Sequence, residues 1–475
     1  MEYQPIGEAA VRHFQKTVGA DFVLTHPEKR AAYGHDETED LQFPPEVVVK
    51  ARSTEEVAGV LRYCHQHRHP VTASGARTGL SGGALPVKGG VALNLERMDQ
   101  ILQIDERNLQ ARVQPGVINQ VFHEACREKG LFYPPDPSSW GSSTLGGNLA
   151  HNAGGPRAVK YGVTSAYVLD LEVVLATGEV IRTGAPVLKN STGYNLTQLM
   201  VGSEGTLGVI TEATFRLIPY PRHKRLMLAP FGSAEEACEA VSAIFQAGIT
   251  PSAMEFMERD AIDYTLRFLP EVNLPVGPEV GAHLLIEVDG QHPELLMQEC
   301  EDMMEILEQH GGQEILLADS AKQTEQLWAL RRKVGEAVKS HSVYKEEDTV
   351  VPRAELARLL KGVKEIGRRY GFESVCYGHA GDGNLHVNII KGDLSDRAWR
   401  EELPGGIREI FGLVRELGGT LSGEHGIGWV QQAYLDVVMD VAERQVQVRI
   451  KETLDPRGIL NPGKIWGEET LLGNN

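Results

Sequence analysis

A glycine-dense stretch, GARTGLSGGALPVKGG, occupies residues 75–90 of this 475-residue chain. Six of its sixteen residues are glycine, which lets backbone approach a ligand closely and lets successive N–H groups turn toward an anion. The stretch therefore predicts a loop that cradles a diphosphate. A long hairpin loop without a ligand is the alternative that these residues alone leave open.

Two more stretches rich in glycine and asparagine follow, at residues 134–162 and 190–219, separated by β-like sequence. One large ligand wrapped by several loops explains this arrangement better than three unrelated turns do. After Pro219 the helical stretches become longer, which predicts a domain boundary near residues 219–221.

Strand-like and helix-like pieces alternate before the first glycine loop, and Ser53 with Glu56 predicts a capping box at a helix start. No GxGxxG motif lies between a strand and a helix, so a tightly held nicotinamide cofactor is not expected. The stretch GILNPGKI at residues 458–465 matches a P-loop only as far as Lys464. The glycine loops therefore belong to neither of these nucleotide-binding types.

The formal charge of −18 argues against nucleic acid and against anionic membrane surfaces as partners. No run of about 18 apolar residues is present to cross a membrane, and the N-terminal stretch MEYQPIGEAAVRHFQ lacks the pattern of a secretory signal. Five scattered cysteines without a CxxC spacing predict a reducing, cytoplasmic location.

The stretch YGHAGDGNLHVNII at residues 377–390 places an Asp-Gly pair between two histidines. Such a pair between alternating apolar residues predicts a hairpin with a two-residue type I′ turn. With Asp382–Gly383 as the loop, His379 faces His386 directly, and Asn388 shares that face. Two neutral imidazoles with Cβ atoms roughly 5 Å apart could hold one divalent metal; histidines that merely cap a core are the alternative.

Five motifs in this order resemble the vanillyl-alcohol-oxidase type of FAD-binding flavoproteins: SGARTGLSGG, STLGGNLAHNAGG, GYNLTQLMVGSEGTLGVITE, GHAGDGNLH and SGEHGIG. Within that superfamily they are similar to the D-2-hydroxy-acid dehydrogenases, which include the glycolate oxidase FAD subunit, D-lactate dehydrogenase and D-2-hydroxyglutarate dehydrogenase. The resemblance implies an α+β fold. It places a two-subdomain FAD-binding domain at residues 1–219, a cap domain with an antiparallel sheet at 220–427, and a returning C-terminal segment at 428–475.

Carried over position by position, the resemblance implies that the first glycine loop cradles the FAD diphosphate and that the later loops line the adenosine and the flavin. FAD is expected to be noncovalent, because the first loop offers no His or Cys for a covalent bond. The expected diphosphate residues are Gly75, Arg77, Thr78, Gly79, Ser81 and Gly82. The expected adenosine and flavin residues are Pro135, Asp136, Ser142, Ser143, Gly146, Gly147, Asn148, Asn152, Glu204, Gly208 and Ile210.

The resemblance also makes His379, His386 and Glu424 ligands of one divalent metal, with His425 beside the flavin. Two nitrogens and one carboxylate leave coordination positions open, as catalytic metal sites do, and zinc, manganese and iron all suit these ligands. The implied mechanism lowers the pKa of the substrate hydroxyl at the metal, gives its proton to His425 as general base, and passes the α-hydrogen as hydride to flavin N5.

An anionic substrate needs a cationic partner in this acidic protein. Arg331 and Lys345 match the substrate-carboxylate positions of the family, although one residue fewer separates them than in the hydroxyglutarate enzymes. Arg332 is the competing choice for Arg331. Asn388 is a candidate hydrogen-bond donor to the substrate, and Tyr194 is predicted either beside the flavin or in the core.

The expected function is FAD-dependent oxidation of a small D-2-hydroxy acid, D-lactate or glycolate, because no second cationic site for a distal carboxylate is evident. The electrons would pass to a separate acceptor: a quinone, an electron-transfer flavoprotein or an iron-sulfur subunit. The alternatives are a D-2-hydroxyglutarate dehydrogenase, a non-redox FAD transferase of the alkylglycerone-phosphate synthase type, and a flavin-free metal protein. A homodimer is the candidate assembly.

Overall fold

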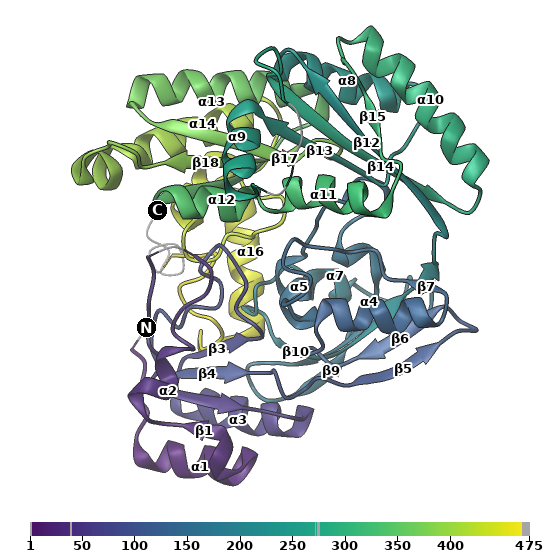
Figure 1. The fold of residues 1–475 in the computed structure, drawn as a ribbon. Helices are drawn as coiled ribbons and strands as arrows, with labels where there is room; N and C mark the ends of the chain where they lie inside the picture. Colours follow the sequence, from purple (N-terminus) through teal and green to yellow (C-terminus); the bar gives the residue numbers. More distant parts are fainter. Residues whose placement is uncertain (1, 39, 271, 273–275, 468–475) are drawn as a thin grey trace. The chain divides into compact units, whose positions relative to one another are not determined.

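The computed structural model describes residues 2–38, 40–270, 272 and 276–467 (Figure 1). The chain forms two compact units. The first unit consists of Met1–Gly154, Val163–Tyr220 and Glu424–Asn475, and the second unit consists of Gly155–Gly162 and Pro221–Gly423. The boundaries predicted from sequence lie after residues 219 and 427, and no motif predicts that residues 155–162 join the second unit.

One sheet of the first unit has the strand order β1-β2-β4-β3, in which β2, β4 and β3 run parallel. Every residue of β4 is buried, as expected for a parallel strand covered on both faces. The strands are β1 (Val23–Leu24), β2 (Val47–Lys50), β3 (Val71–Ser74) and β4 (Val91–Asn94).

Helix α3 (Thr54–His67) begins where the sequence predicts it. The Ser53 side chain accepts the N–H of Glu56 at 3.3 Å, but the Glu56 carboxylate accepts the N–H of Arg52 instead of that of Ser53. The cap is therefore present, and the reciprocal half of the predicted capping box is not formed.

A second sheet of the first unit is antiparallel, with the order β5-β6-β10-β8-β9. Its strands are β5 (Ile101–Asp105), β6 (Gln110–Val113), β8 (Val168–Val174), β9 (Val180–Arg182) and β10 (Val209–Arg216), and β7 (Leu131–Phe132) pairs with β11 (Ile218–Pro219). The other helices of this unit are α1 (Glu8–Val18), η1 (Ala20–Phe22), α2 (Pro27–Ala31), α4 (Asn119–Glu128), α5 (Leu145–His151), η2 (Thr164–Tyr167), α7 (Leu196–Met200), η5 (Gln432–Tyr434), α15 (Leu435–Val438) and α16 (Val441–Leu454).

The C-terminal part of the chain is built into the parallel sheet. Leu460 forms a parallel bridge with Val71 on β3, and both Ile459 and Leu460 are buried in the same core as Val47 and Val91. Residues more than 350 positions apart in sequence therefore share one hydrophobic core in the first unit.

The second unit is built on one antiparallel sheet with the order β15-β12-β14-β13-β17-β18-β16. Together with its helices, this sheet confirms the predicted α+β class. The strands are β12 (His223–Phe231), β13 (Ala253–Glu258), β14 (Ala282–Gly290), β15 (Leu316–Leu317), β16 (Tyr344–Val350), β17 (Glu373–His379) and β18 (Asn384–Ile390). The helices are α6 (Ala158–Tyr161), α8 (Ala234–Gln246), α9 (Arg259–Phe268), α10 (Pro293–Gln309), α11 (Ala321–Arg332), α12 (Val334–His341), η3 (Arg353–Glu355), α13 (Leu356–Tyr370), η4 (Ala398–Glu402) and α14 (Leu403–Glu416).

The two faces of this sheet carry different helices. Helices α9, α11 and α12 pack with Met257, Leu285 and Tyr377 in one hydrophobic cluster, while α8, α10 and α13 pack on other parts of the sheet (Figure 1). Within the described part of the chain, no helix combines the length and apolarity needed to cross a bilayer.

The predicted histidine hairpin forms, but with a longer turn. His379 pairs with Asn384, and His386 pairs with Tyr377, so residues 380–383 make a four-residue loop in which only Gly383 has positive φ (+84°). The two-residue type I′ turn and the direct pairing of His379 with His386 are therefore wrong. The loop is fixed instead by its neighbours, because Gly381 donates to the Met254 carbonyl and Gly383 accepts from Val351 N–H.

Candidate functional site

In the first unit, the first glycine loop follows β3 and packs against the start of α5. A Cβ atom on Gly75 would overlap Oγ1 of Thr144, the residue that caps α5 by accepting the N–H of Gly147 at 3.3 Å. Two of the predicted glycine-rich loops are thus brought together, and only glycine fits at residue 75.

Buried polar atoms gather in these two loops. Ser81, Ser143 and Asn148 are 1%, 2% and 4% exposed. Considering only described residues, Ser81 Oγ, Ser143 Oγ, Asn148 Nδ2 and Arg77 Nε have no hydrogen-bond partner. Polar atoms buried without partners cost free energy, so this set fits a ligand that carries several acceptor oxygens, as FAD does.

Other residues predicted to bind FAD shape the loops. They make the following hydrogen bonds inside the first unit: Gly82 N–H to Thr38 Oγ1 (2.7 Å), Asn119 Nδ2 to the Pro135 carbonyl (3.1 Å), Ser142 Oγ to the Ser139 carbonyl (3.2 Å) and Ser165 N–H to Asn152 Oδ1 (2.9 Å). Gly146 and Gly208 lie where a Cβ atom would collide with Pro115 and Val173. Contact of these residues with FAD stays a prediction.

Glu204 has partners that the sequence does not predict. Its carboxylate accepts the N–H groups of Ile427 and Gly428, each at 2.7 Å. The Asn461 side chain donates to the Glu204 carbonyl at 2.8 Å, and Glu204 itself takes a left-handed conformation with φ +52°. The carboxylate predicted to line the flavin therefore holds the backbone that follows His425.

Glu424 and His425 lie in the first unit, directly after the last residue of the second. Oε1 of Glu424 is 3.7 Å from Nε2 of His425. Gly154 leaves space for the carboxylate, because a Cβ atom there would lie 3.2 Å from Glu424 Oε2. Since His379 and His386 belong to the second unit, the predicted three-ligand set draws on both units and stays a prediction.

His379 and His386 are neighbours on one face of the second unit's sheet. Their ring centroids are 5.3 Å apart, and the side chains are buried. His379 Nδ1 lies 2.8 and 2.9 Å from the two Glu255 carboxylate oxygens, and His386 Nδ1 lies 3.3 Å from Glu346 Oε1. A carboxylate hydrogen-bonded at Nδ1 orients an imidazole so that Nε2 is the ligand atom, which applies to His379. Two neighbouring buried imidazoles of this kind fit a divalent metal.

Glu255 also pairs with Arg331. Both residues are buried, with 2.7 Å between Arg331 Nε and Glu255 Oε2, and the guanidinium lies 4.9 Å from the centroid of the Tyr377 ring. Burial alone would raise the pKa of Glu255, but Arg331 and His379 hold that pKa below its ordinary value. No described residue accepts a hydrogen bond from Arg331 Nη2, so the buried cation retains a donor for an anion.

The strand register decides which other predicted residues share this face. Asn388 is fully buried and lies opposite Glu346, two residues from His386. Lys345 lies opposite Ile389, and because side chains alternate along a strand, it points to the other face. There its Nζ lies 5.3 Å from the centroid of the Trp399 ring. The sheet therefore brings Arg331 and Asn388 to the histidines and does not bring Lys345.

The two remaining candidates lie at the surface. Arg332 is exposed, with its guanidinium 4.8 Å from the centroid of the Trp328 ring, so it is the weaker choice for a buried substrate carboxylate. Tyr194 is 94% exposed, and its predicted place in the core is wrong.

Sequence reasoning missed Glu255, Glu346 and Asp348, which surround the histidines. Glu255 is one of two acidic residues, with Glu258, in the buried strand AMEFME, and a buried carboxylate requires a cation or donor as partner. That pattern could have marked Glu255, but its partners come from β17 and α11 and are visible only in three dimensions.

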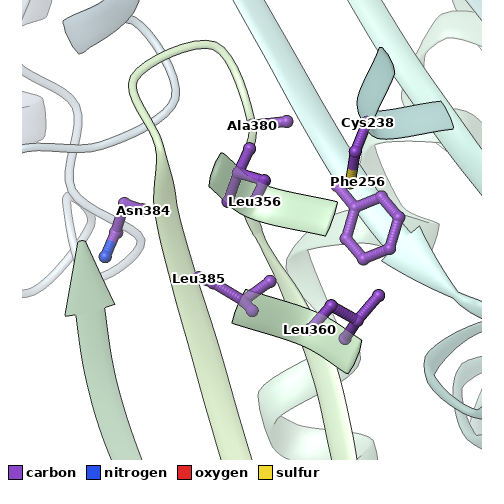
Figure 2. Close-up of a pocket in the computed structure, with 7 residues that line it drawn as sticks. All are labelled: Cys238, Phe256, Leu356, Leu360, Ala380, Asn384 and Leu385. Carbon is purple, nitrogen blue, oxygen red and sulfur yellow. The ribbon is translucent and has the colours of Figure 1, made fainter. Parts of the chain in front are cut away.

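A small apolar pocket lies elsewhere in the second unit, between the sheet and helices α8 and α13. Figure 2 shows its lining: Cys238, Phe256, Leu356, Leu360, Ala380, Asn384 and Leu385. The gap does not admit a water-sized molecule, and burial raises the pKa of the Cys238 thiol to about 12. It is a packing gap and offers no substrate site.

Solved structures share the fold at low sequence identity. The chain matches a p-cresol methylhydroxylase structure with substrate bound at a TM-score of 0.81 and 18% identity, covering 98% of this chain and 99% of that one. An alkyldihydroxyacetonephosphate synthase structure matches with a TM-score of 0.73 and 19% identity, over 97% and 86% of the two chains. These matches confirm the predicted type of FAD-binding fold.

Other proteins have a higher sequence identity to this chain than these solved structures do. The chain is 38% identical to a D-lactate dehydrogenase of Anaerostipes hadrus over 98% of each chain. It is 40% identical to the glycolate oxidase subunit GlcD of Bacillus subtilis over 93% of each. It is 34% identical to a D-2-hydroxyglutarate dehydrogenase of Stutzerimonas stutzeri, over 94% of this chain and 96% of that protein.

Two family profiles divide the chain in the same order as the predicted domains. The FAD binding domain matches residues 45–184, and the C-terminal domain of FAD linked oxidases matches residues 220–465. With the loops, the fold and the relatives in agreement, the chain belongs to the FAD-linked oxidase family.

Proposed function

We propose that this protein oxidises a small D-2-hydroxy acid, D-lactate or glycolate, to the 2-oxo acid. Full-length relatives named as D-lactate dehydrogenase and glycolate oxidase subunit support the reaction class. The observation that carries the proposal is the buried group formed by His379, Glu255 and Arg331. It offers a metal ligand and an anion-binding cation on one face of a sheet.

Arg331 is the proposed partner of the substrate carboxylate. Its guanidinium is buried and forms an ion pair with Glu255 through Nε. Since no described residue accepts a hydrogen bond from Nη2, this group can donate to an incoming carboxylate. Asn388 is the proposed hydrogen-bond donor to the substrate. Lys345 is left out of this proposed site, because its side chain points to the opposite face of the sheet.

His379 and His386, with Glu424, are the proposed ligands of a divalent metal. His425 is the proposed general base, which accepts the proton of the α-hydroxyl at an imidazole nitrogen. When bound, FAD supplies a two-electron acceptor for the α-hydrogen and its electron pair, and a divalent metal supplies a Lewis acid that lowers the pKa of the hydroxyl. A separate acceptor then takes the electrons.

The test is an anaerobic visible spectrum of the purified protein before and after D-lactate, L-lactate, glycolate and D-2-hydroxyglutarate are added separately. Bleaching of the flavin band by D-lactate or glycolate, and not by L-lactate, is the expected result. Bleaching by D-2-hydroxyglutarate alone would move the substrate to the larger acid. A flavin band that none of these acids bleaches would contradict the proposal.

A further inference from the structure

Glu424 and His425 lie where the chain passes from the second unit to the first. A buried carboxylate holds the backbone on each side of this pair. Asp348 holds the residues before it, within the second unit, and Glu204 holds the residues after it, within the first unit.

Asp348 lies on β16 and is 3% exposed. Its Oδ2 accepts the Ser422 hydroxyl at 2.7 Å and the Gly423 N–H at 2.9 Å, and its Oδ1 accepts the Asn384 amide at 2.7 Å. A Cβ atom on Gly423 would collide with the side chains of Val350 and Asn384. The end of the second unit is therefore fixed against β16 and the first residue of β18.

Glu204 is 6% exposed and makes the matching contact in the first unit. Its two carboxylate oxygens accept two successive N–H groups, those of Ile427 and Gly428. Gly426 has φ +79°, and a Cβ atom there would lie 2.8 Å from Glu204 Oε1. The carboxylate thus fits closely around the turn that follows His425.

We infer that Asp348 and Glu204 are positioning residues for Glu424 and His425, an inference that rests on the proposed function. Three residues, 424–426, separate the two held backbone segments, so fixing both ends restricts where the carboxylate and the imidazole between them can lie. Hydrogen bonds from N–H groups to an ionised carboxylate are roughly twice as strong as neutral ones. Replacing either carboxylate by an amide therefore loosens the segment while the side-chain volume is kept.

Hydrogen exchange of the FAD-loaded protein tests the two contacts directly. E204Q is expected to speed exchange of the Ile427 and Gly428 amides roughly tenfold or more, because a neutral amide accepts these N–H groups more weakly than an ionised carboxylate and offers one acceptor oxygen instead of two. D348N should do the same at Gly423, and S422A, which leaves the carboxylate in place, should have a smaller effect there. Unchanged exchange in the first two variants would overturn the inference.

Two matched controls replace buried carboxylates that accept backbone N–H groups elsewhere. E258Q alters the acceptor of Cys376 N–H in the second unit, and D170N alters the acceptor of Gly184 N–H in the first. Both are expected to leave exchange across residues 422–428 unchanged. If they loosen this segment as much as E204Q and D348N do, the effect is general destabilisation and the inference fails.

Stopped-flow kinetics then measures the consequence for the reaction. E204Q and D348N should slow anaerobic reduction of the flavin by the hydroxy acid roughly 10- to 100-fold. The rates are taken per bound FAD, and reoxidation of the chemically reduced flavin by ferricyanide should not change. Normal reduction of these variants overturns the inference alone, whereas a wild-type flavin that no hydroxy acid reduces overturns the proposed function and the catalytic role of the segment with it.

Discussion

At the scale of single residues, Glu255 shows how one buried carboxylate orients two functional groups. It accepts from His379 Nδ1 and pairs with Arg331 Nε, and a neutral amide cannot serve both in the same way. E255Q is therefore expected to weaken divalent metal binding roughly 10- to 100-fold. Calorimetric titration of the metal-free, FAD-loaded protein with Zn²⁺ measures this.

The matched control for this change is E287Q, a buried carboxylate on β14 that accepts from the Trp328 indole at 3.1 Å. It should leave the metal affinity unchanged. Equal affinities in wild type, E255Q and E287Q would remove Glu255 from the metal site.

Arg331 is expected to bind the substrate carboxylate and also to neutralise the buried Glu255. R331A should raise KM for the acid, and it should also destabilise the second unit by about 3–5 kcal/mol, because Glu255 then remains buried without its cation. R331K should recover part of the stability and little of the KM, since lysine lacks the planar fork. The exposed Arg332 provides the control variant R332A; a KM that rises in R332A and not in R331A would reverse the assignment.

At the scale of elements, sequence alternation predicts which side chains share a face, and not which residues pair. The hairpin places His379, His386 and Asn388 on one face as predicted, although the longer turn shifts its register by two residues. Alternation could not predict the face of Lys345, because that face depends on how β16 pairs with β18. The contacts of Glu255 could not be predicted from the sequence either, because its partners come from distant parts of the chain. The glycine loops could be predicted because glycine has no side chain and therefore lets the backbone pack closely against its neighbours.

The four-residue turn of the hairpin leads to a prediction at this scale. Gly383 has φ +84°, and a Cβ atom there would overlap the Val351 carbonyl oxygen. G383A is therefore expected to destabilise the second unit by about 1–3 kcal/mol, measured by urea unfolding. G392A is the control, because Gly392 also has positive φ (+46°) but open space around its Cβ position. Equal losses in both variants would show that backbone strain alone decides the effect.

At the scale of the whole molecule, each unit contains a buried base whose pKa is strongly lowered. In the first unit, burial lowers the pKa of Lys464 to about 7, against the opposing charges of Glu204 and Asp36. In the second unit, burial and the charge of Arg259 lower the pKa of His283 to about 4. The largest changes of stability with pH from these two bases are therefore expected in different pH ranges.

Stability changes with pH in the same direction in both units. Between the folded and the unfolded pKa of each base, the unfolded chain binds more protons than the folded one, so stability rises with pH. Stability should rise with pH from about 7 to 10.5 for Lys464 and from about 4 to 6.5 for His283, by at most about 1.4 kcal/mol per pH unit. Hydrogen exchange of peptides from β10 and β14 follows each unit separately in the FAD-loaded protein. K464M should reduce the rise in the first unit only, and H283N should reduce the rise in the second only. A K464M profile parallel to wild type above pH 7 would mean that Lys464 stays charged in the fold.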